Sequence, residues 1–231
     1  MTGEDPETPE PGTEKSESRP GTPAAYRAAS SPPAAAGPGA GDLSERVVDT
    51  QILHRGHYLD FRIVTIERAD GSRGRRDIVG HPGAVAIVAI DDARRVLLVR
   101  QWRVAVGAAL LEIPAGTLDV DAASGTTEDP DAAAARELEE ETGYRAGTWE
   151  KLGSFWTAPG FATELMHLYL ATDLRVADGE RAGPDEDERL ELERMPWQDA
   201  VAAADRGEIL DAKSLVGLYR LARRMGDAPR R

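Results

Sequence analysis

The sequence predicts an α+β fold in which helices pack on a mixed β-sheet. Short β-branched and apolar runs dominate residues 47–102, a helix-like segment follows, more strand-like runs come next, and two segments with helical spacing close the chain. This order of strands, helix, strands and helices is typical of a sheet covered by helices. The 231 residues, of which 41% are hydrophobic, suffice for the core of one ordinary domain.

A long N-terminal segment is expected to lie outside that domain. Residues 1–41 contain eight of the fifteen prolines, interspersed with Gly, Ser, Thr and Ala. Because so few large apolar side chains cannot offset the entropy cost of ordering, we predict a disordered tail. We assign residues 42–80 to N-terminal antiparallel strands, residues 81–226 to the main domain and residues 227–231 to a C-terminal tail.

Turn-forming residues separate the strand candidates of the first half. The stretches ADGSRG and DDAR predict turns between five strands in hairpins, at VVDTQILHR, LDFRIVTIER, RRDIVG, GAVAIVAI and RVLLVRQW. After LLEIPAG we expect a loop, DVDAASGTTEDP. Further strands are predicted at TWEKLGSFW and ELMHLYLATDL, an acidic loop at ADGERAGPDEDERLELE, and two helices at PWQDAVAAADRGEI and DAKSLVGLYRLARRM.

The helix in the middle of the chain has clear start and stop signals. Asp129 suits the N-cap, Pro130 the first helical position, and Asp131 complements the helix dipole. Gly143 is placed to end the helix. We therefore predict a helix of about thirteen residues between them.

Four glutamates crowd the last turns of this helix, in the stretch ARELEEETGY. Glu137, Glu140 and Glu141 share one face because they are three and four residues apart, whereas Glu139 points elsewhere. Like charges at this spacing repel by about 0.2–0.5 kcal/mol per pair. One interpretation is an ordinary solvated acidic face. The other is a site for a divalent cation, since magnesium takes oxygen ligands and bridges carboxylates to phosphates.

The composition argues against several classes of protein. Without cysteine the chain can form no disulfide, cysteine-ligated zinc site or thiol nucleophile, and its longest apolar run, AVAIVAI, is too short to cross a bilayer. With an acidic rather than basic N-terminus, we expect a cytoplasmic protein. The formal charge is −13, and residues 42–231 still carry 35 acidic against 25 basic side chains. Such a chain is not expected to bind nucleic acid or a membrane.

The stretch RELEEETGY, Arg136–Tyr144, resembles the second half of the Nudix box, R-E-U-x-E-E-x-G-U with U apolar, if Tyr144 is accepted at the last position. Glu128 stands where the box has its earlier glutamate, and Gly116 corresponds to its first glycine. Eleven residues separate Gly116 from Glu128, against five in the family, so the loop is six residues longer, with DAASGTT as the insertion. The resemblance implies a Nudix fold, an α/β/α sandwich with a mixed sheet between helices, preceded here by a small antiparallel sheet.

Four further features resemble the ADP-ribose pyrophosphatase branch of the Nudix family. They are the N-terminal strands, which that branch uses for dimerisation and for gripping adenine; QWRVAVGAALLEIPAG, which carries Arg103, Glu112 and Ala115; Pro159, fifteen residues beyond Tyr144; and DEDERLELE, where the branch has a catalytic loop glutamate. The resemblance implies a homodimer that hydrolyses ADP-ribose, a nucleoside diphosphate sugar, to AMP and ribose 5-phosphate.

The resemblance also implies roles for particular residues. Two or three Mg²⁺ ions, with Mn²⁺ as a substitute, would be held by Glu137, Glu141 and the carbonyl of Ala115, with Glu140 assisting and Arg136 orienting a glutamate. Glu186, or Glu188 as the alternative, would act as the base that orients or deprotonates the attacking water. An ordinary acidic surface loop is the competing interpretation of both residues.

The substrate-binding candidates each have a structural alternative. Arg76 and Arg103 could clamp phosphate or ribose oxygens, or form salt bridges on the strand surface. Glu112 could bind ribose hydroxyls or pair with an arginine. Tyr58 and Phe61 could stack on adenine across a dimer, or belong to the core.

Four other functions are weighed against ADP-ribose hydrolysis. The first is the same reaction on another nucleoside diphosphate sugar, such as GDP-mannose or UDP-glucose. The second is a non-catalytic module that senses ADP-ribose, although such modules usually lose a box glutamate and none is missing here. The third is a calcium-binding protein, but this sequence lacks the D-x-D-x-D-G spacing. The fourth is an NADH-hydrolysing enzyme, but this sequence lacks the SQPWPFP-like stretch of such enzymes.

Overall fold

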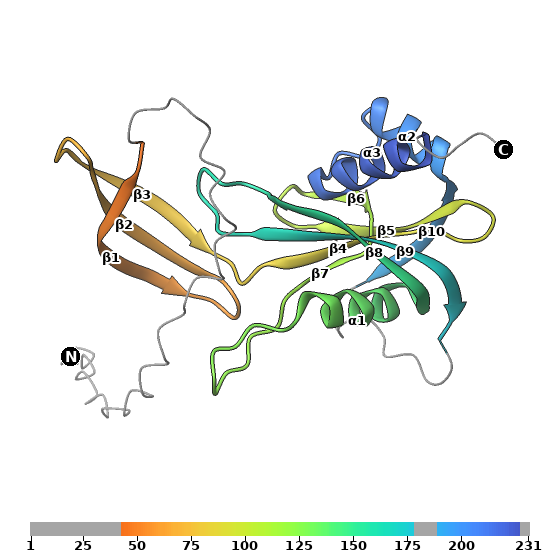
Figure 1. Cartoon of the computed structure of the whole chain (residues 1–231), viewed down its shortest axis with the longest axis horizontal. Helices are drawn as coiled ribbons and strands as arrows, with labels where there is room; N and C mark the ends of the chain where they lie inside the picture. Colours follow the sequence, from red (N-terminus) through yellow and green to blue (C-terminus); the bar gives the residue numbers. More distant parts are fainter. Residues whose placement is uncertain (1–42, 178–188, 227–231) are drawn as a thin grey trace, which may run out of the picture.

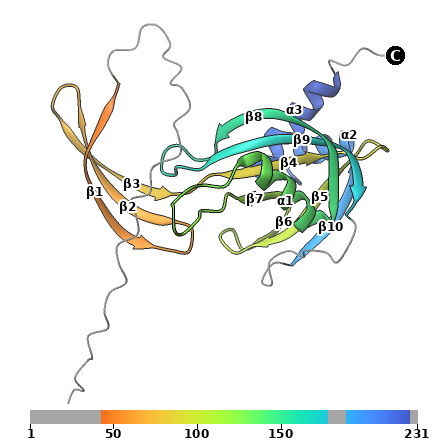
Figure 2. The ribbon, with the colours of Figure 1, turned by 60° about the horizontal axis from the view of Figure 1, so that its bottom comes forward.

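The computed structural model describes residues 43–177 and 189–226. An N-terminal sheet consists of β1 (Glu45–Arg55), β2 (Asp60–Arg68) and β3 (Arg73–Gly80), in that order and antiparallel. It stands beside the rest of the molecule, and the chain leaves it through β3 (Figure 2). The backbone N–H of Val79 donates to the Phe161 carbonyl at 2.7 Å, and that of Thr163 donates to the Val79 carbonyl at 3.0 Å, so two hydrogen bonds fasten the end of β3 to the core.

Two further sheets build the core. The four-stranded sheet has the order β7 (Ala115–Thr117), β4 (Ala84–Ala89), β9 (Leu165–Val176) and β8 (Tyr144–Trp156). Strands β4 and β9 are parallel and the other neighbours antiparallel, so this sheet is mixed, as predicted. The three-stranded sheet has the order β10 (Leu190–Pro196), β5 (Arg95–Arg103) and β6 (Ala108–Glu112).

Helices cover the core from two sides, which gives the three layers of an α/β/α sandwich (Figure 1). Helix α1 (Pro130–Thr142) lies on one side, and α2 (Trp197–Asp205) and α3 (Ala212–Gly226) lie on the other. The predicted fold class is therefore confirmed. None of the helices in the described part of the chain is both long and apolar enough to cross a membrane.

Strand β4 explains how the two apolar layers arise. Every residue of this strand is buried, because successive side chains point to opposite faces and each face has a helix against it. Val85 and Ile87 pack in the cluster that includes Leu138 of α1. Ala86 and Val88 pack in the cluster on the α3 side. A fully apolar strand is thus the expected signature of a central position.

The ends of α1 are as the sequence predicts. The Asp129 carboxylate accepts hydrogen bonds from the backbone N–H groups of Asp131 and Ala132 at 2.9 and 3.3 Å. Gly143 has a φ of 72°, a conformation that a residue with a Cβ rarely adopts. The helix has thirteen residues between these caps.

The prediction of five strands in hairpins is wrong for part of the chain. The β1–β2 and β2–β3 hairpins exist, but β4 pairs with β7 and β9 rather than with β5. The turn between β4 and β5 is closed by an isolated bridge between Ile90 and Val96 and by a hydrogen bond from the Asp91 N–H to the Arg95 carbonyl at 2.9 Å. Local sequence cannot distinguish a hairpin partner from one 80 residues away, because the pairing is decided by which strands face the same helix layer.

Three strands were not anticipated. Strands β6 and β7 lie in AALLEIPAGT, where the sequence pattern predicts no strand, and β10 begins inside the predicted acidic loop. Leu190 and Leu192 of β10 are less exposed than Glu191 between them, so the segment alternates as a strand does. The many charged residues of this segment make the alternation hard to recognise in the sequence alone.

Candidate active site

The carboxylates of α1 converge on the backbone of β7. The Glu141 side chain is buried, and its Oε2 accepts a hydrogen bond from the backbone N–H of Ala115 at 3.0 Å. The Glu137 carboxylate lies against Gly116 so closely that a Cβ at that position would overlap it. Gly116 therefore allows the approach of helix and strand that brings both glutamates to one place.

Arg136 balances the charge of this group. Its Nη1 forms ion pairs with Glu137 and Glu140, each at 2.8 Å, and its Nη2 pairs with Glu128 at 2.8 Å. The hydrogen bond to Glu128 is the main reason why the pKa of Arg136 is raised, and the same bond holds the pKa of Glu128 below its usual value. One guanidinium thus gathers three carboxylates that would otherwise repel one another.

Glu139 is separate from the group, as the helical spacing predicts. It forms a two-fold ion pair with Arg145, with both distances 2.6 Å, on the exposed side of the helix. The acidic run is therefore divided: Glu139 belongs to the surface, Glu137 and Glu141 lie against the Ala115–Gly116 backbone, and Glu140 pairs with Arg136.

The group offers the ligands that a magnesium ion prefers. Within residues 43–177 and 189–226, no three acidic or histidine side chains are already arranged in metal-holding geometry, because Arg136 and the Ala115 N–H hold the carboxylates. The donors are nevertheless carboxylate oxygens next to a main-chain strand, and Gly116 leaves the room for them. The residues therefore fit a hard divalent cation in kind.

The longer loop before α1 keeps Glu128 beside Arg136. The backbone N–H of Glu128 donates to the Asp119 carbonyl at 2.8 Å, and the Asp119 N–H donates to the Glu128 carboxylate at 3.3 Å. Val120 and Thr127 form an isolated bridge, and the Asp121 carboxylate accepts from Ser124 N–H at 2.7 Å within the loop. The inserted residues thus project as a closed turn, which lies beside the β1–β2 turn (Figures 1 and 2).

Arg103 and Glu112 form a two-fold ion pair at the ends of β5 and β6. Arg103 Nε and Nη2 lie 2.8 and 2.7 Å from the two oxygens of Glu112, which is 1% exposed. Burial acts to raise the pKa of Glu112, but Arg103 and Lys213 outweigh it and hold that pKa below its usual value. Of the two interpretations of Glu112, the arginine pair is the one present here.

Lys213, Asp211 and Ser214 surround this pair and were not identified from the sequence. Lys213 Nζ pairs with Glu112 and, at 3.1 Å, with Asp211. Ser214 accepts a hydrogen bond from the Ile113 N–H at 2.8 Å. The sequence feature that could have identified them is the N-cap pattern DAKS at the start of the last helix. In the structure, the Asp211 carboxylate accepts a hydrogen bond from the Ser214 N–H at 2.9 Å, as an N-cap residue does.

Arg76 lies on the N-terminal sheet. Its guanidinium pairs with Glu45 at 2.5 Å and donates to the Arg75 carbonyl at 3.0 Å. In this structure it forms the strand-surface salt bridge, which was one of its two interpretations.

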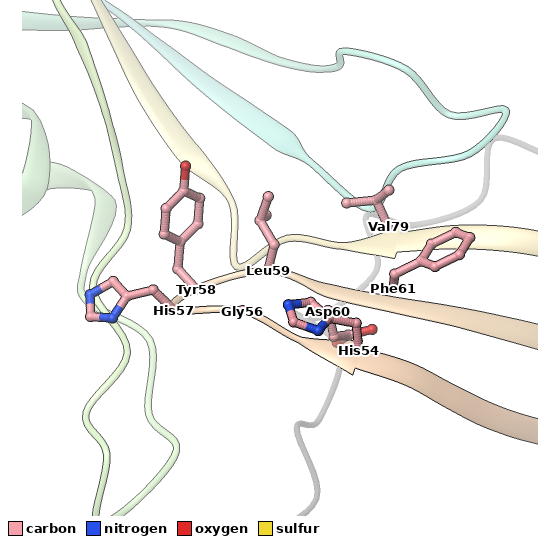
Figure 3. Close-up of a pocket in the computed structure, with 8 residues that line it drawn as sticks. All are labelled: His54, Gly56, His57, Tyr58, Leu59, Asp60, Phe61 and Val79. Atoms are coloured by element: carbon pink, nitrogen blue, oxygen red, sulfur yellow. The ribbon is translucent and has the colours of Figure 1, made fainter. Parts of the chain in front are cut away.

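Tyr58 and Phe61 are not part of the core of this chain. They are 55% and 39% exposed and line a cavity of about 390 Å³ at the β1–β2 turn. Its walls come from the end of β1, the turn, the start of β2 and from β3 (Figure 3), with the lining residues His54, Gly56, His57, Tyr58, Leu59, Asp60, Phe61 and Val79. The Tyr58 ring meets His81 edge to face, with 5.9 Å between ring centroids.

The two candidate bases, Glu186 and Glu188, lie outside the described residues. Arg189, the first described residue after them, directly precedes β10, which pairs with β5.

Comparisons with known proteins agree with this fold and identify the family of the chain. A family model, the NUDIX domain, matches residues 80–215. An ADP-ribose pyrophosphatase of Bacillus subtilis is 36% identical over 78% of this chain and 93% of its own length, and a methanol dehydrogenase activator of Bacillus methanolicus is 37% identical over the same shares. A GDP-mannose pyrophosphatase of Cronobacter sakazakii is 31% identical over 78% of this chain and 95% of its own length.

A solved structure, described as an ADP compounds hydrolase, has the same fold. It superposes with a TM-score of 0.69 at 22% identity and covers 84% of this chain and 100% of its own.

The molecule is thus an enzyme of the class that hydrolyses pyrophosphate bonds. The chain belongs to the Nudix family, whose members generally use divalent metal ions. The resemblance to the ADP-ribose pyrophosphatase branch, seen in RELEEETGY and its context, is confirmed by these relatives.

Proposed function

We propose that this enzyme hydrolyses the pyrophosphate bond of ADP-ribose to AMP and ribose 5-phosphate with the help of Mg²⁺. The observation that carries the proposal is the convergence of the α1 carboxylates on Ala115 and Gly116, in a chain whose relatives include ADP-ribose pyrophosphatases. Glu137, Glu141 and the Ala115 carbonyl would hold the metal, and Glu140 would assist. When bound, two or three Mg²⁺ or Mn²⁺ ions would neutralise the charge of the pyrophosphate and would lower the pKa of the attacking water.

Arg136 keeps the glutamates in place for this chemistry. Its ion pairs to Glu137, Glu140 and Glu128 orient their oxygens before any cation arrives. Glu186, or Glu188 in its place, takes the proton from the attacking water. This assignment rests on the resemblance of DEDERLELE to the catalytic loop of related enzymes.

The substrate is held from two directions. Arg103, fixed by Glu112, offers a guanidinium to phosphate or ribose oxygens, and its pKa is raised by the hydrogen bonds to Glu112, so it remains charged. Arg76, although paired with Glu45 here, is a second candidate for that contact. Tyr58 and Phe61 stack on adenine, which suits their exposure in a cavity.

The N-terminal strands, residues 42–80, form the contact of a homodimer. Val47, Ile52 and Leu53 of β1 are 55%, 40% and 46% exposed, which is unusual for apolar residues of a regular strand and is consistent with a partner covering them. The enzyme is assigned to the cytoplasm, which suits its cysteine-free sequence and its nucleotide substrate.

A second substrate class is a different nucleoside diphosphate sugar. The GDP-mannose pyrophosphatases among the relatives support it, at 31–33% identity. The α1 carboxylates would act identically on GDP-mannose or UDP-glucose, and only the contacts of the base in the N-terminal sheet would differ. A non-catalytic sensor of ADP-ribose is the remaining alternative.

One experiment separates these possibilities. The full-length protein is incubated with ADP-ribose, GDP-mannose, UDP-glucose, NADH and diadenosine polyphosphates in Mg²⁺, in Mn²⁺ and in EDTA, and the products are resolved by chromatography. We expect AMP and ribose 5-phosphate from ADP-ribose, faster than from the other compounds and only with a divalent ion. Faster hydrolysis of GDP-mannose would reject the proposed substrate, and tight binding of ADP-ribose without turnover would identify a sensor.

A further inference from the structure

A buried run of charged side chains connects the start of α3 to Arg103. Lys213, in the first turn of α3, is 8% exposed, and its Nζ pairs with the fully buried Glu112 and with Asp211. Glu112 in turn holds Arg103 through two hydrogen bonds, at 2.8 and 2.7 Å. Lys213 is more than 100 residues from Arg103 in sequence, and Glu112 joins them.

The same turn of α3 is fixed to the strand connection that leads to the carboxylate group. Ser214 accepts a hydrogen bond from the Ile113 N–H at 2.8 Å and donates to Asp211 at 2.6 Å. Ile113 is two residues before Ala115, whose N–H donates to Glu141. Lys213 is therefore held at a defined place relative to both β6 and the carboxylates of α1.

Glu112 is paired with two cations, Arg103 and Lys213, and the second cation affects how far Glu112 neutralises Arg103. A buried carboxylate is costly unless cations and hydrogen bonds surround it. If Arg103 were the sole partner of Glu112, that carboxylate would largely neutralise the positive charge of Arg103. Because Lys213 supplies a second cation, Glu112 can orient Arg103 without fully neutralising it. The Arg103 side chain remains 40% exposed, and its Nη1 takes no part in the pair with Glu112.

We propose that Lys213 is a positioning residue of this enzyme: its ammonium group keeps Glu112 charged and in place, so that Glu112 presents the Arg103 guanidinium to the anionic substrate. This inference rests on the proposed substrate-binding role of Arg103. Lys213 itself does not touch the substrate, and acts through two side chains.

The arrangement has a consequence for the pH dependence of substrate binding. The charged groups that face one another here are Arg103 from β5, Glu112 from β6, Asp211 and Lys213 at the start of α3, and Glu141 of α1, whose charge also acts on Arg103. Without the Lys213 charge, Glu112 is protonated at a higher pH than in the wild type, because its charged form has lost a partner. Protonated Glu112 no longer holds Arg103. As pH falls, the rise in KM therefore begins at a higher pH without the Lys213 charge than in the wild type.

The test compares Lys213→Gln, which keeps a hydrogen-bond donor without the charge, with Lys213→Arg, which restores the charge. The matched control is Ser214→Ala, since Ser214 is the adjacent residue, is fully buried and joins the same helix turn to the same strand connection without carrying a charge. KM, kcat and Tm are measured at saturating Mg²⁺ across pH, with the substrate that the wild type hydrolyses best.

We expect Lys213→Gln to raise KM by about tenfold, with a much smaller change in kcat and with the acidic limb of kcat/KM moved to higher pH. Lys213→Arg should recover most of the wild-type KM, and Ser214→Ala should lower Tm without moving the acidic limb. An unchanged KM in Lys213→Gln overturns the inference, as does an equal rise of KM in Ser214→Ala. If Lys213→Gln does not fold, Lys213→Arg decides alone: a displaced acidic limb in that variant overturns the inference.

Arg103→Gln distinguishes a failure of this inference from a failure of the proposed function. If Arg103→Gln leaves KM unchanged, Arg103 does not bind substrate and that part of the proposed function is wrong. If Arg103→Gln raises KM and Lys213→Gln does not, only the positioning role of Lys213 is wrong.

Discussion

The Glu137 carboxylate occupies the space that a Cβ on Gly116 would require. Glu137 lies in the middle of α1 and Gly116 at the centre of the short strand β7, so the absence of one side chain permits the approach of another. At this position the glycine is required by space rather than by backbone conformation, since an added Cβ would meet the carboxyl carbon and both oxygens of Glu137.

Gly116→Ala should therefore displace Glu137 and reduce hydrolysis. We expect kcat to fall by about a hundredfold, which corresponds to about 2.7 kcal/mol of lost transition-state stabilisation. Steady-state kinetics with an Mg²⁺ titration would reveal a weakened metal dependence. Gly160→Ala is the matched control, because a Cβ there would meet nothing within 4 Å. Equal activity of the two variants would mean that the position of Glu137 is unimportant.

Glu141→Gln should abolish turnover and leave the fold intact. The amide keeps the size of the side chain and can still accept from the Ala115 N–H, but it lacks the charge that a divalent ion requires. A fall in kcat of about a thousandfold or more is expected. Glu139→Gln provides the control, since Glu139 is on the same helix but pairs with Arg145 on the surface. Calorimetric titration with Mg²⁺ or Mn²⁺ should show loss of binding in Glu141→Gln only.

The pair of Glu128 and Arg136 should make stability depend on pH. Arg136 lowers the pKa of Glu128 in the folded state, so the folded protein binds this proton less readily than the unfolded chain does. The stabilisation is complete above the unfolded pKa of about 4.3 and is lost as pH falls through the lower, folded value. The difference in Tm between wild type and Glu128→Gln should thus be largest near neutral pH and shrink below about pH 4. A difference that stays constant from neutral to acidic pH would contradict the linkage.

Tyr58→Ala and Phe61→Ala should raise KM for ADP-ribose and should lower Tm only slightly. Both rings are partly exposed beside a cavity, so removing one costs little core packing but takes away a stacking surface. The expected loss is about 1 kcal/mol per ring, or roughly a fivefold rise in KM. Tyr219→Ala, which removes a similarly exposed ring from α3, should leave KM unchanged. Kinetics with ADP-ribose and ribose 5-phosphate inhibition would locate the effect at the base.

Deletion of residues 121–126 should be tolerated. Val120 and Thr127 already form a bridge, so joining them requires little backbone movement, and Glu128 keeps its contacts with Asp119 and Arg136. Halving such a loop changes its closure entropy by only about 0.6 kcal/mol. We expect Tm and metal-dependent hydrolysis to be nearly retained. A loss of hydrolysis with an unchanged Tm would instead indicate that the inserted turn contacts the substrate.

The sequence by itself determined α1 and the face on which its carboxylates lie. The caps at Asp129 and Gly143 and the shared face of Glu137, Glu140 and Glu141 follow from spacings of three and four residues, which a helix converts directly into geometry. The separation of Glu139 from that face was predictable for the same reason. Family membership was also readable, because the second half of the box, Arg136–Tyr144, lies on this one helix and at its end.

Only the tertiary structure decided which distant segments meet. It placed β4 between β7 and β9 instead of in a hairpin, joined Asp119 to Glu128 across the inserted loop, and brought Lys213 to Glu112 from the start of α3. No local periodicity in the sequence predicts any of these contacts. They result from the burial of apolar faces in two layers, which selects strand neighbours and buried ion pairs over the whole chain rather than within a window of residues.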